Sequence, residues 1–314
     1  MMAGLQHSGR LREAIALAYR QACTIELAAL KPGNVHRYAD GHGMTQADFV
    51  TSADVSAGPL TEPALGLGER IFRSVAATRE AVGCNTNLGI LLLCAPLIQA
   101  LFDGRQDRGS LRRMLHPILL RADAEDTQWL FQAIELAAPG GLGESDRYDV
   151  RSSVDVPLLE VMAYAAGRDQ IARQYTTCYE DLFVFALPRL QACQRRWQSW
   201  EWAATGLFLS LLARFPDTHI QRRHGSEKAI DISRRAAVLS EGLSRAGQPE
   251  NYRKQLLEAD SEFKRNDINP GTTADLTVAA LFIMNLEQMC STFVSDTGFS
   301  RTRDSRPYAV GFPI

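Results

Sequence analysis

The sequence has no apolar run long enough to cross a membrane. Its most apolar stretch, Leu88–Phe102, is shorter than the roughly 20 residues that a membrane span needs, and Gly89, Pro96 and Gln99 interrupt it. The N-terminal segment carries charges at short intervals and shows no apolar core before a small-residue cleavage site, so it does not resemble a secretory signal. We therefore expect a cytoplasmic protein without a membrane partner.

The chain also has little net charge and no paired cysteine motif. Its 34 basic and 36 acidic residues give a formal net charge of −2, which excludes a bulk attraction for nucleic acid, so local groups must hold any phosphate-bearing ligand. The six cysteines form no C-x-x-C pair and lie mostly among apolar neighbours. We interpret them as buried thiols, since free cysteine is among the most buried residue types, and a catalytic role for Cys84 stays open.

What the sequence has in abundance is helical periodicity. Apolar residues make up 46% of the chain, enough for a sizeable core, and no segment shows a sustained period-two alternation. One face of the first helix collects Leu11, Ile15, Ala18, Ala22 and Ile25. We predict an all-α fold with a single multi-helix domain over residues 1–294, because no Pro-, Gly- or Ser-rich linker divides it.

Further helices are predicted with approximate boundaries, and the end of the chain is predicted to be irregular. The expected helices cover residues 46–57, 63–81, 86–102, 110–121, 124–138, 155–166, 169–192, 196–214, 226–245, 249–265 and 272–291. Residues 295–314 have no helical pattern and form the expected C-terminal tail. The connections between helices are where polar residues concentrate, and we expect a ligand site built from these interhelical loops.

The segment Lys31–His42, "KPGNVHRYADGH", follows an amphipathic helix that Pro32 and Gly33 end. Six side chains that could bind a ligand then crowd into a short stretch: Lys31, Asn34, His36, Arg37, Asp40 and His42. A plain surface loop would look similar, so both interpretations stay open. Thr45 and Asp48 are spaced as a capping box for the next helix.

The segment Gly83–Gly89, "GCNTNLG", joins two expected helices. One of Asn85, Thr86 and Asn87 would serve as the N-cap of the second helix. Three consecutive amide or hydroxyl side chains exceed what one cap needs. The surplus favours hydrogen bonding to a ligand.

The segment Pro139–Asp149, "PGGLGESDRYD", combines glycines with carboxylates. The glycines, among them Gly140 and Gly141, stop a helix and allow the backbone to approach a ligand closely. The nearby carboxylates are those of Glu144, Asp146 and Asp149. This density suits Mg²⁺, which prefers carboxylate, water and phosphate oxygens, although a solvated acidic turn has the same composition.

The segment Asp217–Gly225, "DTHIQRRHG", places acidic and basic groups side by side. Asp217 lies near Arg222 and Arg223, and this mixture suits a metal-bound polyphosphate, because arginine forks onto phosphate oxygens while a carboxylate holds the cation. A salt-bridged surface turn is the alternative. His219 and His224 lack the metal-ligand company that zinc requires.

The segment Asn269–Thr277, "NPGTTADLT", is explained locally by a capping box made of Thr272 and Asp275. It lacks the terminal Lys and Ser/Thr of a P-loop, which disfavours a Walker-type NTPase. An aspartate in the first turn would repel a bare phosphate, whereas Mg²⁺ between them makes the arrangement attractive. A phosphate site here therefore depends on a metal.

Taken together, these motifs resemble the triphosphoribosyl-dephospho-coenzyme A synthase family, helical enzymes associated with making the prosthetic group of citrate lyase and malonate decarboxylase. The likeness spans most of the chain. It rests on six stretches in the family's order, namely KPGNVH, DFVTSA, GCNTNLG, PGGLGESDRYDV, DTHIQRRHG and NPGTTADLT. The resemblance implies a pentosyltransferase in which the ribose 2′-hydroxyl of dephospho-CoA attacks the anomeric carbon of the ATP ribose and expels adenine.

The resemblance also implies roles for particular residues. Lys31 and Arg223 would bind phosphates, Asp217 and Asp275 would bind Mg²⁺, and Asp149 or Glu144 would be the general base. The remaining substrate-binding candidates are Gly33, Asn34, His36, Asn85, Thr86, Asn87, Gly140, Gly141, Gly271 and Thr272. The implied partners are ATP or another phosphorylated nucleotide or sugar and a dephospho-CoA-like acceptor, with a homodimer left open.

The chain departs from the family pattern at the expected site. Asn87 and Leu88 stand where better-known members carry a His-Lys pair, and Thr272 and Thr273 replace a Gly-Ser pair. Such members resemble a branch associated with one-carbon cofactors of the methanopterin or methanofuran kind, so a related Mg²⁺-dependent enzyme using another phosphorylated donor is the first alternative. The second is a non-catalytic helical binding protein whose loops are merely well capped.

Overall fold

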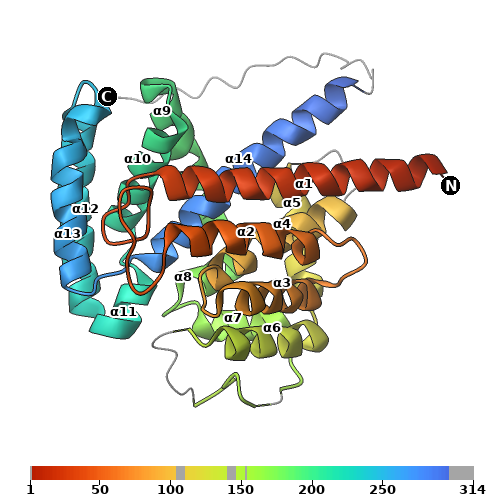
Figure 1. Cartoon of the computed structure of the whole chain (residues 1–314). Helices are drawn as coiled ribbons and strands as arrows, with labels where there is room; N and C mark the ends of the chain where they lie inside the picture. Colours follow the sequence, from red (N-terminus) through yellow and green to blue (C-terminus); the bar gives the residue numbers. More distant parts are fainter. Residues whose placement is uncertain (1, 104–109, 140–145, 153, 297–314) are drawn as a thin grey trace, which may run out of the picture.

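The structure is a computed structural model that describes residues 2–103, 110–139, 146–152 and 154–296. Over these ranges the chain folds into helices and has no β-strand, with two isolated bridges in the loop before the second helix (Figure 1). The predicted all-α fold is confirmed. None of the helices so described combines the length and the apolar composition that crossing a membrane requires.

The helices follow one another through short connections. The α-helices are α1 (Met2–Ala28), α2 (Gln46–Leu60), α3 (Leu67–Val82), α4 (Leu88–Asp103), α5 (Leu111–Arg121), α6 (Ala124–Ala137), α7 (Leu158–Ala165), α8 (Gln170–Thr176), α9 (Leu187–Trp197), α10 (Trp200–Arg214), α11 (Thr218–His224), α12 (Ser226–Arg245), α13 (Arg253–Arg265) and α14 (Gly271–Asp296). A π-helical turn (Asp181–Ala186) precedes α9, and a 3₁₀ turn (Pro249–Tyr252) precedes α13. α14 runs past the expected start of the tail at residue 295, and residues 297–314 lie outside the described ranges.

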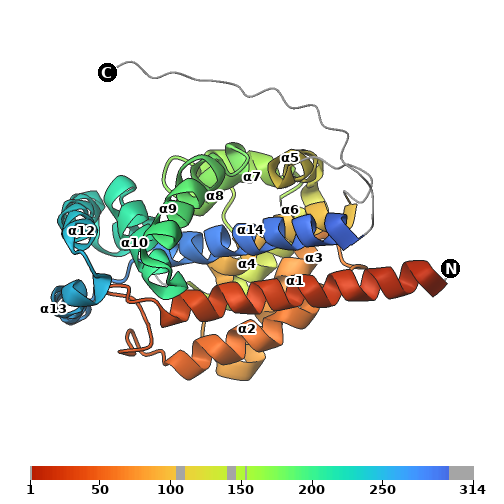
Figure 2. The same cartoon turned by 90° about the horizontal axis from the view of Figure 1, so that it is seen from above.

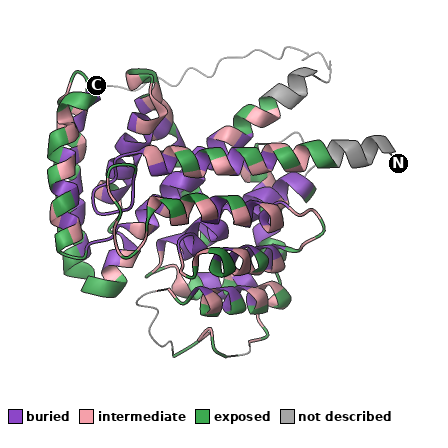
Figure 3. Cartoon of the chain, in the orientation of Figure 1, coloured by how far each residue is buried: buried purple, intermediate pink, exposed green. Residues whose placement is uncertain are grey.

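Two apolar helices form the centre of the domain. In α4 every residue is buried except Gln99 and Asp103, as expected for a helix that is apolar on all sides. Figure 3 shows that buried residues gather in the interior of the bundle and exposed residues on the outer faces of the helices. α14 packs against α1, α4 and α10, and Figure 2 shows it running between α1 and the layer that contains α5 to α9. A second, smaller apolar cluster joins α10 to the outer helices α12 and α13. The loops at one end of this bundle are therefore held on a rigid core.

Two predicted elements differ from the structure. The helix expected over residues 169–192 is broken into α8, the π-helical turn and α9, because Cys178 and Tyr179 adopt positive φ angles of 49° and 58°. The segment expected to be a loop after Asp217 contains α11. The capping box of Thr45 and Asp48 at the start of α2 is confirmed.

Candidate functional site

A cavity of about 840 Å³ lies where the interhelical loops meet. Each of the five polar motifs contributes to its wall, through His42, Asn85, Asp149, Arg223 and Asp275 among others. These residues are far apart in the sequence, and the helical core brings them together. The structure therefore places the loop motifs around one space, as the prediction of a site between helices requires.

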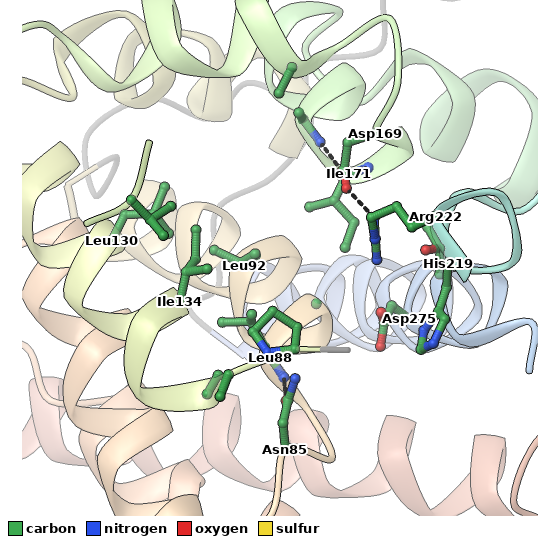
Figure 4. A pocket seen from close by; sticks show the side chains of 18 of the residues that line it. Asn85, Leu88, Leu92, Leu130, Ile134, Asp169, Ile171, His219, Arg222 and Asp275 are labelled. Carbon is green, nitrogen blue, oxygen red and sulfur yellow. Dashed lines mark hydrogen bonds and ion pairs between the residues drawn. The ribbon is translucent and has the colours of Figure 1, made fainter. Parts of the chain in front are cut away.

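The cavity has two chemically different halves (Figure 4). The polar half is formed by α11 and the N-terminal turn of α14, with His219, Arg222 and Asp275. The apolar half lies between α4, α6, α7 and α8, and its wall includes Leu88, Leu92, Leu130, Phe131, Ile134, Val161, Met162, Ala165, Ile171 and Ala172. An elongated ligand with one charged end and one apolar end matches this division.

α11 starts at Asp217, whose carboxylate is the N-cap. Its Oδ1 accepts hydrogen bonds from the backbone N–H groups of His219 (2.8 Å) and Ile220 (3.1 Å). Its Oδ2 accepts from the backbone N–H and the hydroxyl of Thr273, both at 2.7 Å. Burial raises the pKa of Asp217, and the bonds from Thr273 oppose that rise. Asp217 thus joins α11 to the first turn of α14.

This geometry does not support the metal role predicted for Asp217. The side chain is buried, it does not line the cavity, and both of its oxygens are occupied by hydrogen bonds. The predicted capping box of Thr272 and Asp275 is wrong, because α14 already begins at Gly271 and Asp275 accepts no described hydrogen bond. The Thr272 hydroxyl lies 3.2 Å from that of Thr218, and Asp217 supplies the cap from outside the helix.

The two arginines of α11 line the cavity, and each is held by a carboxylate from another element. Arg222 Nη1 lies 2.7 Å from Asp169 Oδ2, and Arg223 Nη2 lies 2.7 Å from Asp267 Oδ2. Asp169 also caps α8, because its Oδ1 accepts from two backbone N–H groups. The guanidinium groups are therefore pre-positioned beside the cavity, where they could fork onto phosphate oxygens.

The carboxylate of Asp275 lies in the wall of the cavity. It is half-buried, and no hydrogen bond or ion pair joins it to another described residue. Burial holds its pKa well above the ordinary value, with further repulsion from Glu26 and Asp217. The carboxylate fits against α4 only because residue 89 is glycine, since a Cβ there would lie 2.1 Å from Asp275 Oδ2.

Lys31 lies outside the cavity wall, which gives its predicted phosphate role no support. Its ammonium group is fully buried, forms an ion pair with Glu26, and donates a hydrogen bond to Asn34 Oδ1 at 3.1 Å. Burial lowers the pKa of Lys31, and the Glu26 carboxylate opposes this shift. Separating the two groups would leave unpaired buried charges, which is costly. The ion pair therefore restrains the segment after α1, which carries Lys31, against the last turn of α1, which carries Glu26.

Gly33, Asn34 and His36 support the loops behind the cavity and do not line it. The N–H of Gly33 donates to Asp260 Oδ1 at 2.9 Å, and its φ of +86° favours glycine. His36 Nε2 lies 3.2 Å from the same Asp260 oxygen. Asn34 Nδ2 donates to Asn269 Oδ1 at 2.8 Å, and Asn269 does line the cavity.

The second motif divides between the cavity and the core. Asn85 lines the cavity and caps α4, because its Oδ1 accepts from the Leu88 N–H at 3.1 Å. Thr86 and Asn87 are buried instead against α2, where they donate to Ser52 Oγ (2.6 Å) and Ser56 Oγ (3.3 Å). Thr86 and Asn87 therefore bond the start of α4 to α2, and of the three polar side chains only Asn85 lines the cavity.

The remaining predicted residues fall into three groups. Asp149 and Thr272 line the cavity, and Asp149 Oδ1 also accepts from the Arg151 N–H at 2.9 Å. Gly271 lies against His219, whose Nδ1 would be 2.7 Å from a Cβ at that position. Gly140, Gly141 and Glu144 lie outside the described residues.

Sequence reasoning left out several residues that line the cavity. The sequence suggests no role for His219 beyond a zinc ligand, for which it lacks partners, yet its ring lies in the cavity wall, and burial together with Arg222 and Arg223 lowers its pKa to about 4. Asp169 follows α7 and stands in no polar motif. The apolar lining residues carry a helical pattern that cannot be told from that of core residues.

Fold and cavity together define a helical protein with one cavity that is charged on one side and apolar on the other. A family model described as ATP:dephospho-CoA triphosphoribosyl transferase (CitG) matches residues 12–292, and the chain belongs to this family. It is therefore an enzyme of the pentosyltransferase class, and the predicted resemblance is confirmed.

A solved structure supports the same assignment. It comes from Archaeoglobus fulgidus and is described as a "putative triphosphoribosyl-dephospho-coA synthase". The two chains share 25% sequence identity with a TM-score of 0.58, over 74% of this chain and 95% of the other. No curated protein matches the chain.

Proposed function

We propose that the protein transfers the triphosphoribosyl group of ATP to a hydroxyl of dephospho-CoA and releases adenine, in a reaction that requires Mg²⁺. The observation that carries the proposal is the cavity in which Arg222, Arg223 and Asp275 face the same space as a long apolar wall. Family membership supports the substrate pair. A nucleoside triphosphate has the same division into a charged end and a less polar end.

The charges of the cavity support a requirement for a divalent cation. Among the described lining residues, four arginines (Arg79, Arg168, Arg222, Arg223) and four aspartates (Asp146, Asp149, Asp169, Asp275) cancel formally. A triphosphate alone would add several negative charges to a partly dehydrated space that has no net positive charge to offset them. A cation entering with the triphosphate restores the balance.

Asp275 is the side chain that fits the metal best. Its carboxylate faces the cavity without a described partner, and burial disfavours its ionised form, so a nearby cation would stabilise it. The described residues contain no cluster of three or more His, Cys, Asp or Glu that could enclose a metal. This is compatible with Mg²⁺, which binds through one or two carboxylates together with substrate phosphates and water. When bound, Mg²⁺ would neutralise charge on the triphosphate.

The reaction transfers a sugar carbon between two nucleophiles. The acceptor hydroxyl oxygen forms a bond to C1′ of the ATP ribose, the C1′–N9 bond breaks, and adenine leaves with the electron pair. The hydroxyl proton passes to a carboxylate, the departing adenine takes up one proton from water, and the carboxylate then returns its proton to water, so that the net transfer is one proton from the hydroxyl to adenine. Asp149 lines the cavity and remains the base candidate among described residues, while Arg222 and Arg223 would orient the triphosphate.

The test is to incubate the protein with ATP, dephospho-CoA and Mg²⁺ and to measure free adenine by chromatography. We expect adenine to form only when the acceptor and Mg²⁺ are both present, and Asp275→Asn to abolish it. Asp54→Asn is the matched control, because Asp54 is exposed on α2 and pairs with Arg20. Omitting the acceptor separates transfer from simple hydrolysis of ATP.

Absence of adenine at saturating Mg²⁺ would contradict the proposal. If Mg·ATP still raised the melting temperature, the alternative of another donor and acceptor pair in one-carbon cofactor synthesis would be favoured. At 100 times its dissociation constant a ligand should stabilise the protein by about 2.7 kcal/mol. If neither adenine nor such a shift appeared, the non-catalytic alternative would be favoured.

A further inference from the structure

The apolar half of the cavity has no role in holding phosphates. Four helices contribute to its wall, with Leu92 on α4, Ile134 on α6, Met162 on α7 and Ile171 on α8. Apolar side chains that line an open cavity lack the van der Waals contacts that they would make in a filled core. A large cavity of this kind in a stable domain therefore indicates a site that a ligand fills. The ligand group that fits this wall is apolar on its faces.

The two halves meet at Gly89. A Cβ at this position would lie 2.1 Å from Asp275 Oδ2 and 2.7 Å from Ile171 Cδ1, so the carboxylate of one half and the apolar wall of the other converge there. Arg222 lies on the polar side of this boundary (Figure 4), and Arg223, which also lines the cavity, is the next residue of α11. A ligand that spans the cavity therefore passes from the arginines, past the Asp275 carboxylate, to the apolar half, which is called the slot below.

We propose that the apolar half binds the adenine base of the ATP donor, so that the donor's ribose lies at the boundary beside Asp275. This inference rests on the proposed function. A nucleoside triphosphate presents phosphates, sugar and base in the same order as the cavity presents cations, carboxylate and apolar wall. The base is the leaving group, and an apolar slot keeps water away from it.

The pantetheine arm of the acceptor fits this slot less well. Its amide groups would lose hydrogen bonds to water against a wall of apolar side chains, and each group left unsatisfied would weaken binding. A purine has apolar faces and confines its polar atoms to the ring edge. At the rim of the slot, Asn85 has an amide nitrogen that no described residue accepts from, and it could bind such an edge.

Dephospho-CoA also carries an adenine attached to phosphates, so the test must separate the two sources. Ala165, the last residue of α7, lines the cavity and is half-buried. Ala165→Phe would fill part of the slot without altering any charged group. Ala163→Phe is the matched control, because Ala163 lies on the same helix and is exposed.

The experiment measures the affinities of ATP, dephospho-CoA and inorganic tripolyphosphate, each with Mg²⁺, by calorimetry. We expect Ala165→Phe to weaken ATP binding by about tenfold or more and to leave the other two ligands within about twofold of wild type. Ala163→Phe should leave all three unchanged. Ala165→Leu, which adds less volume, replaces the phenylalanine variant if thermal melting shows that the latter does not fold.

Three results would overturn the inference. If Ala165→Phe weakened the binding of ATP and of tripolyphosphate equally, the slot would not be the place where the base binds apart from the phosphates. Weakening of dephospho-CoA alone would assign the slot to the adenine of the acceptor, and no change with any ligand would exclude a base there. If wild type released adenine while the ATP affinity of Ala165→Phe were normal, only this inference would fail. If wild type neither bound ATP nor released adenine, the proposed function would fail with it.

Discussion

The carboxylate of Asp217 binds the first turns of two helices at once, and Thr273 is its partner on the second. One oxygen caps α11, and the other accepts from the backbone N–H and the hydroxyl of Thr273 at 2.7 Å each. These bonds set the position of α11, which carries the two arginines of the cavity, relative to α14, which carries Asp275. The geometry of the polar half therefore depends on a buried side chain that does not touch the cavity.

Asp217→Ala should lower the free energy of unfolding by about 3 kcal/mol, because it removes a helix cap and leaves buried donors of Thr273 unsatisfied. Asp123→Ala is the control. Asp123 accepts from two backbone N–H groups of α6, and its side chain makes no bond to another helix in the described part of the chain, so its loss should cost about 1 kcal/mol. Urea denaturation compares the two variants, and equal costs would show that the bonds to Thr273 contribute nothing.

Gly89→Ala should reduce adenine release at least tenfold, and it should also lower the melting temperature, because the added Cβ would lie 2.7 Å from Ile171 Cδ1 as well as 2.1 Å from Asp275 Oδ2. The added Cβ would clash with Asp275 Oδ2 and push the carboxylate out of place, whereas alanine in a helix is itself favourable. Gly58→Ala on α2 is the control, because a Cβ there meets nothing within 4 Å. Activity of Gly89→Ala equal to that of the control would mean that the position of Asp275 is unimportant for the reaction.

Arg223→Gln should weaken the binding of Mg²⁺-tripolyphosphate by about tenfold. The change removes a guanidinium that could donate charge-assisted hydrogen bonds to phosphate oxygens. Arg234→Gln is the matched control, since Arg234 is exposed on α12 and pairs with Asp231. Calorimetry measures both. A normal affinity in Arg223→Gln would remove this arginine from the phosphate site.

His36 should make the protein less stable as the pH falls. Burial lowers the pKa of His36 from its ordinary value of 6.5, although Asp260 opposes the shift. The unfolded chain therefore takes up the proton first, and stability decreases as the pH falls through 6.5 toward the lowered value. His36→Gln should flatten the dependence of the unfolding free energy on pH between 7 and 5. The same change at exposed His116 is the control, and an unchanged slope in His36→Gln would contradict the assignment.

The helical scaffold could be predicted from the sequence because periodicity and caps are local properties. The sequence predicts the cap of α2 by Thr45, and it limits the cap of α4 to Asn85, Thr86 or Asn87, of which the structure uses Asn85. The break after α8 was not, since Cys178 and Tyr179 carry no glycine-like signal for a left-handed backbone. α11 was missed because its seven residues are mostly polar or charged and resemble a loop.

The site was predictable as a set of motifs but not residue by residue. The residue type of Lys31 favours a phosphate ligand. Its ion pair with Glu26 could not be predicted, because it depends on how α1 ends and packs. Asp275 was recognised, but its place opposite Gly89 depends on the contact between α14 and α4. The apolar half went unnoticed, because residues such as Ile134 have the pattern of a core position whether they face a cavity or a neighbouring helix.

The most direct test of the proposed transfer is the mass of its product. The purified protein is incubated with ATP, dephospho-CoA and Mg²⁺, and the mixture is analysed by mass spectrometry. We predict a species in which dephospho-CoA carries a ribose triphosphate, formed in equal amount to free adenine and absent with Asp275→Asn. Adenine without the joined species, or dephospho-CoA recovered unmodified at saturating Mg²⁺, would contradict the proposed function.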